Sequence, residues 1–116
     1  MLIRIKNNQL GEINLIIRIF KVRIDPELRN EFEQKFQEIS IPYVQAQKGL
    51  ISFVVGKPTQ WTPDDYLLIT TWANEEDLVT FAGKNWNQAV IPEGMEKFVV
   101  QCWVDHFVLS DDSQIQ

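Results

Sequence analysis

Two helix starts, each placed directly after a strand-like run, constrain the fold of this chain more than any other feature. The first follows residues 14–24, where Asp25 is a favourable N-cap and Pro26 suits the first helical turn. The second follows residues 66–72 and has the sequence Asn-Glu-Glu-Asp at 74–77. An Asn cap followed by carboxylates suits the positive end of a helix dipole. Two strand-to-helix transitions in a chain of this length indicate an α+β fold.

The first helix is predicted by an apolar stripe that recurs at helical spacing. Ser-Ile-Pro at residues 40–42 is expected to interrupt this helix, with a short second segment up to Lys48. Gly49 then supplies a left-handed stop, and Gly83 breaks the second helix. The stripe consists of Leu28, Phe32, Phe36 and Ile39.

Further strands are predicted at residues 50–55, 66–72 and 98–109. The order is then strand, helix, strand, strand, helix, strand, which is the ferredoxin-like β-α-β-β-α-β pattern with an antiparallel sheet. We expect one domain over residues 1–116, with 1–12 an N-terminal extension or edge strand and 110–116 a polar tail.

The predicted strands are apolar on both faces. Strict alternation puts Phe98, Val100, Cys102 and Val104 on one face of the last strand, and Val99, Trp103, Phe107 and Leu109 on the other. The helices can cover only one face of the sheet. The other would expose about eight large apolar side chains, worth on the order of 10–20 kcal/mol, against a typical domain stability of about 5–15 kcal/mol. We therefore expect a homodimer with facing sheets, and name Val55 and Phe107 as candidate interface residues.

Composition excludes several classes of function. A net charge of -5 without a cluster of basic residues argues against nucleic acid. No apolar run approaches the roughly 20 residues of a membrane helix. The lone Cys102 cannot form an internal disulfide, which favours a reducing, cytoplasmic compartment. A single histidine, His106, cannot complete a metal site with ordinary ligand counts, so we expect no metal.

Across residues 15–109 the chain resembles the antibiotic biosynthesis monooxygenase family, within the dimeric α/β-barrel superfamily. The resemblance rests on the helix entry at 22–27, the helix stop and strand at 48–53, the strand end and acidic helix start at 71–78, and the long final strand. It implies a homodimer with a pocket in each subunit, between helices and sheet. Some members oxidise phenolic polycycles to quinones without metal or flavin; others degrade haem, oxidise quinol-like molecules, or have no known activity.

The chain departs from the better understood branches of this family at particular positions. Haem degraders carry an Asn, a Trp and a haem-ligating His where this chain has Arg18, Phe81 and Ile91. Because isoleucine cannot ligate iron, we expect no haem and no other cofactor. The quinone-forming branch keeps an Asn four residues before the strand-end Trp72, and here that position is Leu68.

Three residues are candidates for catalysis, each with a plainer alternative. Trp72 is predicted to line the pocket and donate its indole N–H to a substrate oxygen, or else to be a core aromatic. Arg18 is predicted to hold a phenolate or developing enolate, or else to bury its stem and leave its head in water. His106 is a candidate general base, or else a structural or interface histidine.

The chain is therefore predicted to be a cofactor-independent monooxygenase acting on a small electron-rich aromatic or quinol-like molecule. The alternatives are a non-catalytic dimeric binder of a small apolar or aromatic ligand, and a structural dimer without a pocket. An oxygenase should bring Arg18, Trp72 and Tyr66 to one cavity. The aromatic residues predicted to contact the substrate, or else to fill a plain core, are Phe32, Phe36, Tyr66, Phe81 and Trp86.

Overall fold

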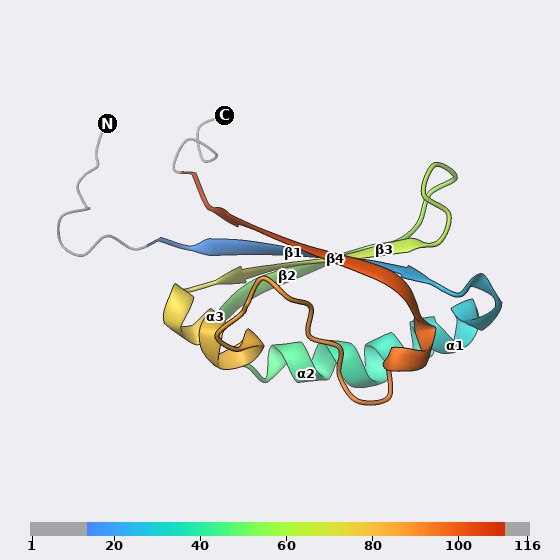
Figure 1. Cartoon of the computed structure of the whole chain (residues 1–116), viewed down its shortest axis with the longest axis horizontal. Helices are drawn as coiled ribbons and strands as arrows, with labels where there is room; N and C mark the ends of the chain where they lie inside the picture. The colour runs from blue at the N-terminus through green and yellow to red at the C-terminus, as the bar shows by residue number, and fades with distance from the viewer. Residues whose placement is uncertain (1–13, 111–116) are drawn as a thin grey trace.

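The computed structural model describes residues 14–110, so the expected N-terminal extension and residues 111–116 of the tail lie outside it. Four strands form one antiparallel sheet in the order β2-β3-β1-β4. All the helices lie against one face of this sheet, as Figure 1 shows. The predicted ferredoxin-like α+β fold is confirmed. The strands are β1 (Ile16–Ile24), β2 (Leu50–Gly56), β3 (Asp65–Trp72) and β4 (Val99–Val108).

Both predicted helix starts are confirmed by their caps. The Asp25 carboxylate accepts a hydrogen bond of 3.0 Å from the backbone N–H of Glu27. The Asn74 side chain accepts one of 2.8 Å from the N–H of Asp77. Each cap satisfies a backbone donor that the helix itself leaves free. The helices are α1 (Arg29–Lys35), α2 (Ile41–Gln45) and α3 (Glu75–Ala82), with 3₁₀ turns at Pro26–Leu28 and Glu96–Phe98.

The predicted interruption at residues 40–42 is wrong, because α1 and α2 are joined by a π-helical turn, Phe36–Ser40. In this turn the N–H of Ile41 donates to the carbonyl of Phe36, five residues earlier. Pro42 then falls in the first turn of α2, where its missing N–H is not needed. The extra residue also rotates the helix face, so Ser40 is buried while Ile39 is half-buried.

The helical segment ends at Gln45, three residues before the predicted end at Lys48, and Ala46 is its C-cap. Gly49 has the predicted positive φ, +89°, but it lies in the turn that leads into β2. Its carbonyl accepts a 2.8 Å hydrogen bond from the N–H of Ala73, at the end of β3. A Cβ at Gly49 would lie 2.4 Å from the Asp77 side chain. The close approach of the β2 start to the α3 start therefore requires glycine for both conformation and space.

Two β-bulges break the strict alternation expected along the strands. In β2 the pairing runs from Leu50 to Ser52 and skips Ile51. In β4 it skips Val100, which is 62% exposed. Each extra residue reverses the faces of the residues on one side of it.

The two bulges correct the face assignments made from sequence. Val99 and Cys102 both pack against the helix-side core, so the grouping of residues 98–100 by strict alternation is wrong. Val55 also packs against that core and is not an interface candidate, whereas its neighbour Val54 is 59% exposed. Phe107 is exposed, as the interface prediction requires.

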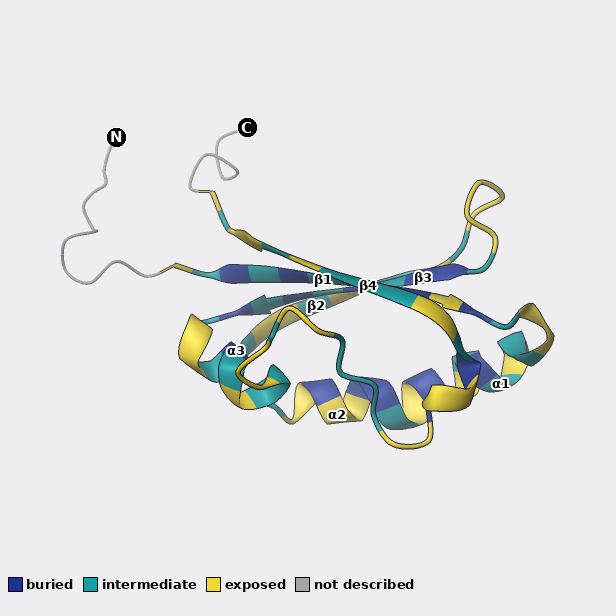
Figure 2. Ribbon diagram, in the orientation of Figure 1, coloured by how far each residue is buried: buried dark blue, intermediate teal, exposed yellow. Residues whose placement is uncertain are grey.

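The core lies between the sheet and the helices. Its larger cluster includes Phe32, Phe36, Leu68 and Phe98, and a smaller one surrounds the fully buried Trp72. Figure 2 shows buried residues on the inner surfaces of helices and sheet. No helix within residues 14–110 is long and apolar enough to span a membrane.

Candidate active site

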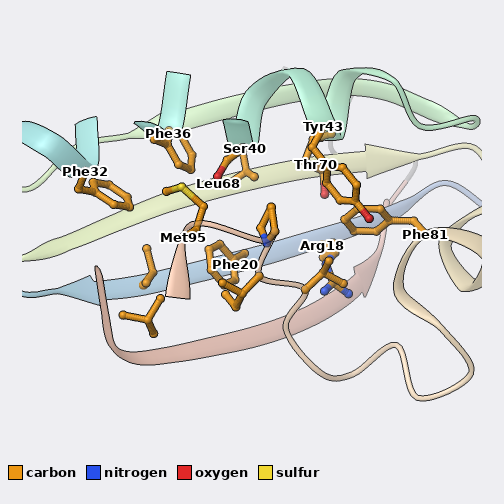
Figure 3. Close-up of a pocket in the computed structure, with 16 residues that line it drawn as sticks. Arg18, Phe20, Phe32, Phe36, Ser40, Tyr43, Leu68, Thr70, Phe81 and Met95 are labelled. Carbon is orange, nitrogen blue, oxygen red and sulfur yellow. The ribbon is translucent and has the colours of Figure 1, made fainter. Parts of the chain in front are cut away.

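A cavity of about 50 Å³ lies between the sheet and the helices. Figure 3 shows its walls, which come from the sheet, the helical segment and the loop that follows α3. Four residues predicted to act at the site line it: Arg18, Phe32, Phe36 and Phe81. Other lining residues were not predicted as site residues; they include Ser40, Tyr43, Leu68, Thr70, Ile91 and Met95.

Arg18 places a buried positive charge in this mostly apolar wall. It is 3% exposed, and its partners are neutral groups. Nη1 donates to the carbonyl of Trp86 at 2.7 Å, and Nη2 donates to the carbonyl of Gln88 at 2.9 Å. Its Cζ lies 5.6 Å from the centre of the Phe81 ring. Within residues 14–110, no carboxylate forms an ion pair with Arg18.

The Arg18 charge persists at neutral pH. Burial lowers the pKa of its guanidinium to about 10, which is still well above neutrality. A buried cation without an anionic partner is costly, so this wall favours any ligand that brings a negative charge.

His106 lies directly across the β1–β4 pairing from Arg18, and its Nε2 is 2.9 Å from Arg18 Nη1. Because a guanidinium can only donate, Nε2 accepts, and the ring is neutral with its proton on Nδ1. Burial, followed by the charge of Arg18, lowers the pKa of His106 to about 4, although Asp105 opposes this. His106 is not part of the cavity wall. Its Nε2 is engaged by Arg18, so His106 acts on the cavity only through Arg18.

Trp72 is fully buried behind the cavity wall and does not line it. Its Nε1 donates a 2.8 Å hydrogen bond to Thr70 Oγ1. Its ring stacks on Phe81, with centroids 4.9 Å apart. In this structure the indole N–H is used within the protein, and Phe81 and Thr70 are the groups that face the cavity.

Tyr66 and Trp86 also lie outside the cavity wall. The Tyr66 hydroxyl donates to Glu33 and accepts from Arg29 at 3.3 Å, beside a separate hollow. Burial, and then Glu33, raise the pKa of Tyr66. Trp86 supplies its carbonyl to Arg18, while its ring packs edge-on against His106 at 4.6 Å. The polar groups that meet at the cavity therefore include Arg18, Thr70 and Ser40 rather than Trp72 and Tyr66.

The sequence held a signal for some of the missed residues. Thr70 shares a strand face with Leu68 and Trp72 by simple alternation, so it belongs to the same wall. Leu68 and Ile91, where the chain departs from the better understood relatives, both line the cavity. Ser40 carried no such signal, because its burial depends on the π turn.

The cavity residues do not fit haem. The position expected to ligate iron, Ile91, presents a hydrocarbon side chain to the cavity. The chain's single histidine, His106, has its Nε2 engaged by Arg18. Within residues 14–110, no group of three or more His, Cys, Asp and Glu side chains is placed to hold a metal ion.

A four-stranded antiparallel sheet covered on one face by helices, with a cavity between the layers, defines a ferredoxin-like α+β protein with an internal pocket. A family model, antibiotic biosynthesis monooxygenase, matches residues 15–86, and the chain belongs to this family. No curated protein sequence matches the chain significantly.

Solved structures share this fold at low sequence identity. A protein of Caulobacter crescentus CB15, assigned provisionally as an antibiotic biosynthesis monooxygenase, is 14% identical with a TM-score of 0.66; the match covers 90% of this chain and 98% of that one. A heme-degrading protein of Mycobacterium tuberculosis is 18% identical with a TM-score of 0.57, covering 83% of this chain and 91% of that one. A conserved protein of Methanosarcina mazei Go1 is 15% identical with a TM-score of 0.64, covering 81% and 91%. These matches establish the fold.

Proposed function

We propose that this protein binds a small electron-rich aromatic or quinol-like molecule in the cavity, with an ionised oxygen at Arg18, and oxidises it with O₂ without a cofactor. The observation that carries the proposal is the buried Arg18 guanidinium, which has no carboxylate partner within residues 14–110 and faces an apolar cavity. Membership of a family of monooxygenases supports the oxidative step.

The free N–H groups of Arg18 suit an oxygen anion. A guanidinium has five N–H groups, and three are engaged with Trp86, Gln88 and His106. One N–H on Nη2 and the Nε–H then remain for a ligand, counting partners within residues 14–110. An apolar cavity alone would raise the pKa of a bound phenol, whereas an adjacent cation lowers it and favours the phenolate. Arg18 is suited to this because it stays charged when buried.

The substrate itself supplies the electrons for the reaction. A hydroquinone gives two electrons and two protons to O₂, which leaves a quinone and H₂O₂. A methylene carbon next to a phenolic ring loses both hydrogens and gains one oxygen atom as a carbonyl, while the second oxygen atom leaves as water. In either case the phenolate raises the electron density that O₂ attacks. The roles of the chain are to bind the anion, hold it at Arg18 and exclude water.

Trp72 and His106 have positioning roles in this proposal. Trp72 orients Phe81 by stacking and orients the Thr70 hydroxyl by its hydrogen bond. His106 orients the guanidinium of Arg18 through Nε2. Phe32, Phe36 and Phe81 provide flat apolar surface for an aromatic ligand.

The test is oxygen consumption with a panel of hydroxylated anthrones and hydroquinones. Arg18→Met should lower turnover at least about 100-fold, the usual cost of losing one group that stabilises a developing anion. Arg23→Met is the matched control, because Arg23 lies on the same strand but its side chain is 46% exposed and pairs with Asp65. If Arg18→Met turns over an accepted substrate as fast as the wild type, the proposed role is wrong. Circular dichroism checks that both variants fold.

A second candidate function is non-catalytic binding of the same kind of ligand. It is favoured by the engagement of the Trp72 N–H, the Tyr66 hydroxyl and His106 Nε2 with other protein groups. His106 is the residue predicted as a general base, and its Nε2 already accepts from Arg18. Arg18-dependent binding without oxygen consumption for any member of the panel would favour this candidate.

We also propose that the protein is a cytoplasmic homodimer that buries the helix-free face of the sheet. This face carries exposed apolar side chains, including Val54 and Phe107. A second copy of the same face would cover them, in an interface of roughly 1,600 Å² or more. The cytoplasmic location is supported by the free thiol of Cys102.

A further inference from the structure

Ser40 presents a buried hydroxyl to the cavity, and nothing in the proposed chemistry uses it. Ser40 is 6% exposed and lines the same cavity as Arg18. No hydrogen-bond partner of this hydroxyl exists within residues 14–110. A buried hydroxyl without a partner costs free energy, so an occupant of the cavity is the natural partner.

The π turn places this hydroxyl in the wall. The turn spans Phe36–Ser40, so Phe36 and Ser40 begin and end it, and both face the cavity. An uninterrupted α-helix would follow the apolar stripe from Phe36 to Ile39. Instead Ile39 is half-buried, and the Ser40 hydroxyl lies in the cavity wall together with the phenylalanine side chains. π turns of this kind often occur at functional sites.

Ser40 and Arg18 belong to opposite walls of the cavity. Arg18 projects from β1 in the sheet, whereas Ser40 projects from the helical layer that covers the sheet (Figure 3). Thr70, the other buried hydroxyl of the wall, already accepts the N–H of Trp72. Thr70 lies on the sheet side next to Arg18, so the hydroxyl-bearing residues across the cavity are Ser40 and Tyr43, and of these two only Ser40 is buried.

We infer that Ser40 is a specificity-determining residue, which hydrogen-bonds a second oxygen on the ligand, away from the oxygen held at Arg18. This rests on the proposed function, since it takes the ligand to be the aromatic molecule bound there. A serine hydroxyl donates and accepts, so the second group is a hydroxyl or a carbonyl oxygen. An aromatic ring with oxygens on opposite edges can pair with both Arg18 and Ser40, whereas a ring with one oxygen held at Arg18 leaves Ser40 without a partner.

The test compares two probes of nearly equal size, hydroquinone and 4-methylphenol, which differ by a hydroxyl against a methyl group. Dissociation constants are measured by calorimetry without oxygen, for the wild type, Ser40→Ala and Ser52→Ala. The wild type should prefer hydroquinone, and Ser40→Ala should weaken hydroquinone binding about 3- to 10-fold, the effect of one neutral hydrogen bond. Binding of 4-methylphenol should be unchanged or tighter in Ser40→Ala. Ser52 is an exposed serine in β2, so Ser52→Ala should leave both constants unchanged.

Each outcome bears on the inference. If both probes bind the wild type but Ser40→Ala leaves the ratio of their dissociation constants unchanged, the role of Ser40 is wrong and the proposed function stands. If neither probe binds the wild type, the proposed function fails and the role of Ser40 fails with it. The melting temperature of the ligand-free protein gives an independent check. Ser40→Ala should leave it unchanged or raise it, and a clear decrease would mean that the hydroxyl has a partner inside the protein.

Discussion

The hydrogen bond between Trp72 and Thr70 gives a direct test of what stabilises the core between the sheet and the helices. Trp72 is fully buried and Thr70 is 3% exposed, with 2.8 Å between Nε1 and Oγ1. Thr70→Val preserves the shape of the side chain but removes the acceptor. The indole N–H is then buried without a partner, which costs about 1–3 kcal/mol. For a chain of 116 residues, each kcal/mol lowers the melting temperature by about 4 °C.

Thr71→Val is the matched control for this experiment. Thr71 is the next residue of β3, so its side chain points to the other face of the sheet, and it is half-buried. Substitutions of this kind usually change stability by less than about 0.5 kcal/mol. Urea unfolding at one fixed protein concentration would measure both variants, since the stability of a dimer depends on concentration.

A double-mutant cycle isolates the hydrogen bond itself. Trp72→Phe removes the donor, so Thr70→Val in that background should cost less than about 0.5 kcal/mol. A loss of stability in Thr70→Val no larger than that in Thr71→Val would show that the Trp72–Thr70 hydrogen bond does not stabilise the fold. The same conclusion would follow if Thr70→Val lowered the free energy of unfolding equally with Trp72 and with Phe at position 72.

Three further predictions concern pH, a glycine and the sheet face. Because the folded pKa of His106 is about 4 against an ordinary value of 6.5, the unfolded chain takes up the proton first as pH falls. Stability from this group should be complete above about pH 6.5 and lost towards pH 4, and His106→Gln should flatten the fall in urea midpoint across that window. Both Gly49 and Gly83 have positive φ, so replacing either by Ala strains the backbone, and Gly83→Ala should cost about 1 kcal/mol. Gly49→Ala should destabilise the protein more, because a Cβ at Gly49 would also clash with Asp77. Thermal melts of the two variants would test this. Equal decreases in melting temperature would contradict the predicted clash. Val54→Asp should convert the proposed dimer into monomers in sedimentation experiments, and a dimer that is unchanged by this substitution would exclude this face as the interface.

The elements that local signals specify could be predicted from the sequence. The caps at Asp25 and Asn74 depend on residues next to them in the chain, and both are confirmed. Because the order of strands and helices along the chain follows from such local signals, the β-α-β-β-α-β pattern was predictable as well. The placement of Arg18 and Phe81 at one cavity followed from the family resemblance to a pocket between helices and sheet.

The rest of the site depends on departures from regular geometry that leave little trace in sequence. A bulge at Ile51 and another at Val100 reverse strand faces, so alternation assigned Val55 to the wrong side. The π turn exchanges Ile39 for Ser40 in the cavity wall. The loop residue Ile91 reaches the cavity across a long sequence separation, in a loop that Arg18 binds through its carbonyls.

The two bulges also make the borders of the sheet poor templates for polymerisation. The strand order places β2 and β4 at the two borders of the sheet, and each of these border strands carries one bulge. An uninterrupted border offers a row of unpaired N–H and C=O groups on which another chain can add as a strand, which is the first step of fibril growth. A bulge bends the strand and breaks this row, so neither border is a regular template. Lateral strand addition is thereby disfavoured on both sides, in contrast to the association through the helix-free face of the sheet that we propose.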